Sequence, residues 1–215
     1  MKKGLYLALG LILAMACIAF AGCGGSGDQQ ETEATEAVTE ATEATTQAAG
    51  SCVYGYTGDD AAVAAAYTYM AEDVSKEYEV KEGMVSVPVV SVVDRVENED
   101  GSVDLYGYFE IYNYTVDGNT LKNESGGSYP GMMHLVKDGD AYKVERFDVV
   151  EDGESYDASA RKIFGDRYEK FSQVSSDDKA REALRGEILA NYVKANDLKV
   201  TKYQDYGWDP IDLTL

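Results

Sequence analysis

The residues best suited to hold a ligand alternate along one segment, from Val103 to Tyr114. If this segment is a strand, its side chains point in turn to the two faces of a sheet. One face is then aliphatic and aromatic, and the other carries Tyr106, Tyr108, Glu110, Tyr112 and Tyr114. Tyrosine rings can stack on a sugar or a peptide, and hydroxyls with a carboxylate can fix it by hydrogen bonds. The alternative is structural, because tyrosine is a good strand former and such a face can lie beneath a helix or the tail.

A hydrolytic site would depend on His134, since the chain has a single histidine. This residue stands beside a glycine-rich segment, residues 125–131, which reads as a loop. Ser125, Ser128 or Cys52 would have to serve as the nucleophile. No Gly-x-Ser-x-Gly elbow is present and no spacing brings these residues together, so an ordinary strand histidine is the simpler interpretation.

Metal, cofactor and nucleic-acid sites are not indicated. In the acidic segment 94–101 the calcium-loop pattern fails, because Gly107 stands where a bidentate glutamate is required. Three cysteines exclude a four-cysteine zinc site. With 39 acidic against 19 basic residues and a formal charge of −20, the chain is a poor partner for phosphate backbones. We therefore predict no metal, no other cofactor and no nucleic acid.

The N-terminus reads as an export signal, with Lys2 and Lys3 followed by an apolar run to Phe20. Its end, Phe20-Ala21-Gly22-Cys23, resembles the lipobox of bacterial lipoproteins. The resemblance implies that residues 1–22 are a signal peptide that is cut off and that the thiol of Cys23 receives a diacylglycerol. The partner is then the cell membrane, held through this lipid anchor on its extracytoplasmic face.

Residues 23–50 are predicted to be the lipidated cysteine and a disordered acidic tether. The stretch from Gly24 to Gly50 has six acidic residues, no basic residue and one large aliphatic side chain, Val38. So little apolar surface does not offset the entropy lost on ordering the chain. Residues 51–215 have the size of one domain, in which Cys52 is an unpaired thiol, either structural or reactive.

The domain is predicted to be α+β. A helix capped by Gly58-Asp59-Asp60 carries Val63, Tyr67, Met70, Val74 and Tyr78 on one face. Asp-Gly turns and β-branched runs then predict an antiparallel sheet of four strands, at residues 84–97, 102–115, 131–137 and 141–150. Two helices follow: one capped by Asp157 and interrupted near Gly165, the other opened by Ser176 or Asp177 and ending near Asn196.

This order of elements, over about residues 60–150, resembles the cystatin-like/NTF2-like class, in which a curved sheet wraps a helix. The resemblance implies an N-terminal helix packed on a curved four-stranded sheet, here with two C-terminal helices.

These observations predict a lipid-anchored extracytoplasmic protein with a non-catalytic binding or accessory domain for an extracellular ligand or an envelope protein. The alternative is an envelope hydrolase that uses the tyrosine face or the region of His134. A third interpretation is a structural or regulatory partner of another membrane protein. A cleft lined by the tyrosines favours the first, polar groups that converge on His134 favour the second, and a flat apolar patch favours the third.

Overall fold

The computed structural model describes residues 56–79 and 81–214. The predicted signal peptide, Cys23, the tether and Cys52 lie outside these residues. Among the described residues, none of the helices combines the length and apolarity needed to cross a membrane.

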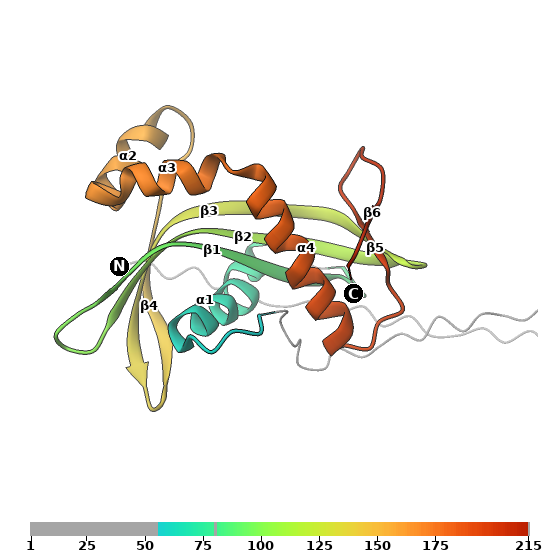
Figure 1. Ribbon diagram of the computed structural model, residues 1–215, viewed down its shortest axis with the longest axis horizontal. Helices are drawn as coiled ribbons and strands as arrows, with labels where there is room; N and C mark the ends of the chain where they lie inside the picture. The colour runs from blue at the N-terminus through green and yellow to red at the C-terminus, as the bar shows by residue number, and fades with distance from the viewer. Residues whose placement is uncertain (1–55, 80, 215) are drawn as a thin grey trace, which may run out of the picture. The chain divides into compact units, whose positions relative to one another are not determined.

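Four long strands form an antiparallel meander, β1-β2-β3-β4 (Figure 1). Their bounds are β1 (Val85–Glu97), β2 (Val103–Asp117), β3 (Thr120–Asp138) and β4 (Ala141–Val149). Asp-Gly pairs stand at all three hairpin turns, and Gly118 between β2 and β3 has φ +59°, which a glycine adopts without strain. β1, β2 and β4 agree with the prediction to within two residues at each end.

β3 differs from the prediction, because it begins at Thr120 rather than near residue 131. The glycine-rich segment is not a loop but pairs with β2 along its length. Gly126 lies opposite Tyr112, and Ser128 lies opposite Glu110. A segment of small residues therefore serves as a strand, because it lies beside the bulky side chains of its neighbour.

Two short strands enlarge the sheet, so it has six strands and not the four expected. β5 (Lys202–Gln204) pairs in parallel with the start of β3, and β6 (Ile211–Asp212) pairs antiparallel with β5. Both come from residues 199–214, the segment that is called the tail below.

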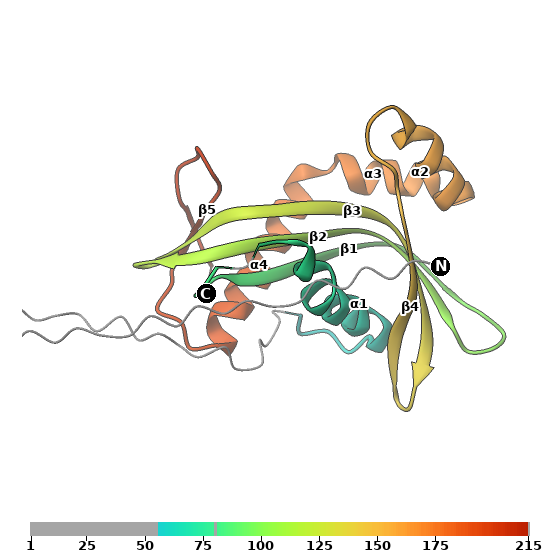
Figure 2. The ribbon, with the colours of Figure 1, turned by 180° about the vertical axis from the view of Figure 1, so that it is seen from behind.

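The first helix, α1 (Ala61–Glu72), packs on the concave face of the curled sheet (Figure 2). Asp60 caps it as predicted, since its carboxylate accepts hydrogen bonds from the backbone N–H groups of Ala62 and Val63. The helix ends at Glu72, earlier than predicted, and Val74 lies in a short 3-10 turn, η1 (Val74–Glu77), that Tyr78 follows in an extended conformation. The buried face of the helix includes Tyr67 and Met70.

The sheet bends along one line across three strands. Val92 pairs with Gly107, and Gly107 pairs with Gly131, while Val93 is the extra residue of a β-bulge. A Cβ at Gly131 would lie 2.2 Å from the backbone oxygen of Asp148, so only glycine allows β3 and β4 to approach this closely. Beyond the bend, the β1–β2 hairpin and the β3–β4 hairpin turn toward the side of α1 (Figures 1 and 2).

Three further helices follow, where two were expected. The first two lie on the other face of the sheet, and the last begins there and runs across β1 toward α1 (Figures 1 and 2). Their bounds are α2 (Tyr156–Phe164), α3 (Tyr168–Ser176) and α4 (Asp178–Ala195), and the short 3-10 turns η2 (Gly153–Ser155) and η3 (Gly165–Arg167) precede α2 and α3. The predicted interruption near Gly165 is what divides the first expected helix into α2 and α3. The cap of α4 is also confirmed, because Asp177 accepts from the N–H of Ala180 and Asn196 follows the last turn.

A second, smaller core joins α2 and α3 to the bend. It consists of Val93, Val150, Ala160, Phe164 and Phe171. The rings of Phe164 and Phe171 stack with centroids 4.0 Å apart. The chain is therefore an α+β protein whose curled, mostly antiparallel sheet has helices on both faces.

Candidate functional site

The tyrosine face of β2 lies beneath a row of arginines from the C-terminal helices. Arg167 lies 4.5 Å from the ring centroid of Tyr106, Arg181 4.6 Å from that of Tyr108, and Arg185 4.6 Å from that of Tyr112. Each contact has the geometry of a cation–π interaction. The row attaches the helices to the sheet, so most of this face is covered and only part of it can meet a ligand.

Arg185 is the most constrained of these arginines. Two of its nitrogens donate to the two carboxylate oxygens of Asp205, over 3.2 and 2.7 Å, and its guanidinium also lies 5.0 Å from the ring of Tyr203. The residue is 8% exposed. Asp205 further accepts from the side-chain amide of Asn123 on β3. This ion pair therefore joins α4, the tail and the sheet.

Glu110 is a buried carboxylate on the strand side. It accepts a hydrogen bond of 2.8 Å from the hydroxyl of Tyr112, and one of its oxygens lies 3.8 Å from Nε of Arg181. Burial raises the pKa of the Glu110 carboxyl above its ordinary value, while Tyr112, Arg181 and Arg185 partly oppose this rise. The group is 6% exposed, so few water molecules can reach it.

Arg181 is held by the end of α3 and by the first turn of its own helix, α4. It donates to the backbone oxygens of Val174 and Ser175 in the last turn of α3. It also donates to Asp178 in the first turn of α4 over 2.6 Å. These contacts fix the position of α3 relative to α4.

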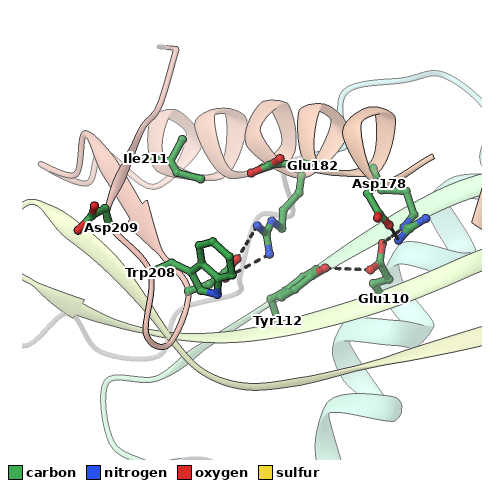
Figure 3. Close-up of a pocket in the computed structure, with 10 residues that line it drawn as sticks. Glu110, Tyr112, Asp178, Glu182, Trp208, Asp209 and Ile211 are labelled. Carbon is green, nitrogen blue, oxygen red and sulfur yellow. Dashed lines mark hydrogen bonds and ion pairs between the residues drawn. The ribbon is translucent and has the colours of Figure 1, made fainter. Parts of the chain in front are cut away.

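A pocket of about 630 Å³ opens between β2, the first turns of α4 and the tail (Figure 3). Glu110 and Tyr112 line it from the strand. The other lining residues are Asp178, Arg181, Glu182 and Arg185 from the helix, and Asp205, Trp208, Asp209 and Ile211 from the tail. The helix residues recur at intervals of three and four, so they share one helix face.

The tail presents two aromatic rings to solvent at this place. Trp208 is 76% exposed and borders the pocket, and Tyr206 is 94% exposed. The turn that carries them is held by a hydrogen bond from the N–H of Trp208 to the oxygen of Asp205 and by one from the side-chain amide of Gln204 to the oxygen of Trp208. Large exposed aromatic side chains beside a cavity are typical of a binding surface.

The pocket is negatively charged. Two arginines face five carboxylates, and the arginines are already engaged by Asp178 and Asp205. Glu182 and Asp209 are exposed at the rim. The site therefore favours ligands that bring hydrogen-bond donors or positive charge to the rim and a flat face to the indole.

His134 lies elsewhere, on β3 beyond the bend. Its Nδ1 is 2.6 Å from Oδ1 of Asp104, and its Nε2 is 3.9 Å from Oε2 of Glu145. Ser128 is six residues away along the same strand, roughly 20 Å at the rise of an extended chain, and Ser125 is farther. The structure thus pairs His134 with a carboxylate but does not bring either candidate serine to it, and His134 does not line the pocket beside Trp208.

Of the five residues predicted to form a ligand face, Glu110 and Tyr112 line the pocket. Tyr106 and Tyr108 are half-buried under Arg167 and Arg181, and Tyr114 is fully buried. The functional residues that the sequence did not indicate lie on α4 and the tail. The one available signal was the tryptophan and tyrosines of the tail, together with arginines four residues apart on α4.

Among residues 56–79 and 81–214, no group of three or more His, Cys, Asp or Glu side chains is arranged to hold a metal ion. Comparison of the chain with models of known protein families, with curated proteins and with solved structures found no match.

Proposed function

We propose that this chain is a membrane-anchored extracytoplasmic lipoprotein whose domain binds an extracellular ligand or an envelope protein without catalysing a reaction on it. The lipobox-like sequence Phe20-Ala21-Gly22-Cys23 supports the anchor, and the acidic stretch after it supports a spacer. We place the domain in the cystatin-like/NTF2-like class, a proposal supported by the sheet that curls around α1.

The observation that carries the binding proposal is the pocket with Trp208 at its rim. Exposure of an indole to water has a free-energy cost that a soluble domain can avoid by using a polar residue. Here the indole stands over walls fixed by the pair Arg185–Asp205, so the site is largely formed before a ligand arrives. A preformed pocket with one exposed ring and a few polar groups is the usual form of a binding site for a small ligand.

Trp208 is the only tryptophan, so its fluorescence reports directly on this pocket. We would titrate the full chain, purified in detergent, with a glucosamine tetramer, which offers flat sugar faces and ammonium donors. The N-acetylated tetramer is the uncharged control. We expect a saturable change in emission that is weaker with the control and is reduced by Glu182→Gln, whereas Glu154→Gln on the exposed turn before α2 has no effect. Absence of a saturable change with both tetramers would contradict this assignment.

The anchor is tested separately. Mass spectrometry of the protein from bacterial membranes is expected to find a mature chain that begins at Cys23 with a diacylglycerol on it. The variant Cys23→Ser should leave the membrane fraction. An unmodified chain that retains residues 1–22 and lies in the cytosol would show that the anchor is wrong.

The contact between His134 and Asp104 favours an envelope hydrolase as the second candidate function. In a hydrolase, His134→Ala would abolish turnover of a p-nitrophenyl ester and leave the Trp208 titration unchanged. A binding module is expected to show no ester turnover that depends on His134.

A further inference from the structure

β3 has an open edge in its middle part. On the side away from β2, its first residues pair with β5 as far as Lys122, and its pairing with β4 begins at Gly131. Within the described part of the chain, residues 123–130 therefore have a strand on one side only.

The pairing shows which backbone groups face outward. The N–H of Val150 donates to the oxygen of Pro130, so that oxygen points away from β2. The register between β2 and β3 is regular from Ser125 to Gly131, and backbone direction alternates along a strand. The N–H and C=O groups of Gly126 and Ser128 therefore also point to the open edge, and both residues are exposed.

A hollow of about 360 Å³ runs along this edge. It is lined by Asn123, Glu124, Ser125, Gly126, Gly127, Ser128 and the rings of Tyr112 and Tyr206. Because Gly126 is the cross-strand neighbour of Tyr112 and has no side chain, the ring of Tyr112 is accessible from the edge. An added strand would find backbone partners along β3 and an aromatic surface beside them.

The charged side chains near residues 123–130 indicate which kind of segment can bind there. Glu124 lies on the strand itself and is exposed. Asp205, at one end, is bonded to Asn123 and is also paired with Arg185, and Glu110, opposite Ser128, is buried. One basic side chain, Lys81, reaches Glu124, at 3.9 Å. A second copy of the chain would bring the same excess of negative charge, −20, and its own edge lies recessed between β4 and β5. Both points favour a separate, positively charged segment.

We propose that the open edge of β3, residues 123–130, binds an extended basic peptide segment of another protein as an added strand. Gly126 and Ser128 exchange backbone hydrogen bonds with it, and Tyr112 and Tyr206 pack against its side chains. Its lysines or arginines lie near Glu124 and Asp205. This site is distinct from the pocket at Trp208, although Tyr112 borders both.

The probe is a fluorescently labelled peptide, acetyl-(Lys-Val)₃-Lys-amide, and the measurement is its fluorescence anisotropy with the full chain in detergent at low salt. We expect saturable binding. Two matched peptides test whether positive charge and backbone hydrogen bonds are needed for binding. One has glutamate in place of lysine, and the other carries a methyl group on every backbone nitrogen. Each is expected to bind at least tenfold more weakly. Equal binding of the methylated peptide, or no binding of the basic one, would overturn the proposal.

Two variants locate the site. Ser128→Pro removes an outward N–H that makes no bond within the sheet, and Ser128→Lys places a like charge beside the peptide; both should weaken binding at least tenfold. Ser172→Lys adds the same charge on the exposed surface of α3 and should leave binding within twofold. If Ser128→Pro does not fold, as judged by circular dichroism, Ser128→Lys decides. The glucosamine titration of Trp208 should be unchanged in Ser128→Lys. The peptide proposal and the proposal of a ligand pocket at Trp208 can therefore fail independently.

Discussion

Arg185 and Asp205 meet through two parallel hydrogen bonds beneath the pocket, and this one contact connects the middle of α4 to the tail. The guanidinium of Arg185 also contacts the rings of Tyr112 and Tyr203. The pair therefore fixes both walls of the pocket at once. Its removal is the most direct way to open the site without touching Trp208.

Asp205→Asn should destabilise the domain by about 3 kcal/mol, because it leaves the charge of Arg185 buried without its partner. Chemical denaturation followed by circular dichroism measures this change. The control is Asp197→Asn, which breaks the exposed pair with Lys199 and should cost less than about 0.5 kcal/mol. Equal effects of the two variants would mean that the Arg185–Asp205 pair does not stabilise the fold.

Glu110→Gln should change the pH dependence of stability. The pKa of Glu110 is raised in the folded state, so the folded protein binds this proton more tightly than the unfolded chain does. The contribution of Glu110 to stability is then fully present below the unfolded pKa and is lost as the pH rises through the folded pKa. Relative to the natural protein, the variant should gain stability as the pH rises above the ordinary pKa of a glutamate, about 4.3. Urea denaturation at several pH values tests this, and a constant difference would contradict it.

Gly131→Ala should destabilise the sheet at its bend, by about 2 kcal/mol or more, since the new methyl group would meet the backbone oxygen of Asp148. Gly186→Ala is the matched control, because a Cβ there has no neighbour within 4 Å and lies inside α4. It should stabilise the protein by about 0.5–1 kcal/mol. Thermal unfolding of both variants gives the comparison. If both substitutions change the stability in the same direction, the sheet does not require glycine at position 131 for the close approach of β3 and β4.

Phe164→Ala should cost about 3–5 kcal/mol, because Phe164 is fully buried and stacks on Phe171 in the small core of α2 and α3. Hydrogen exchange should show the loss of protection concentrated in α2 and α3, with β2 and β3 less affected. Ile163→Ala, on a partly buried neighbour, should cost less. A uniform loss of protection would mean that the two cores unfold together.

Short sequence patterns, such as helix caps and Asp-Gly turns, predicted the helices and strands whose ends they determine. The carboxylates of Asp60 and Asp177 cap helices because each stands just before an apolar periodic segment, and this relation is visible in the sequence. Asp-Gly turns between β-branched runs placed β1, β2 and β4. The expected α+β class followed from these elements, whereas the helix under a curved sheet was implied by the resemblance of their order to the cystatin-like/NTF2-like class.

The remaining features depend on contacts between distant residues. The start of β3 was missed because glycine and serine have little intrinsic preference for strands, and pairing with Tyr112 and Glu110 decides their conformation. β5 and β6 are too short to show a period, and they exist because the tail reaches Thr120 and Leu121. The pocket was missed for the same reason, since Arg185 and Trp208 meet Tyr112 only through these long-range contacts.

The parallel pairing of β5 with β3 has a consequence for the order of folding. Thr201 and Asn119, whose side chains are hydrogen-bonded beside that pairing, are 82 positions apart in the chain. Closing so long a segment carries a large entropic cost, so local hairpins form before it does. During synthesis the meander can thus assemble while the pocket beside Trp208 is still incomplete. That pocket closes only after the C-terminal segment has docked.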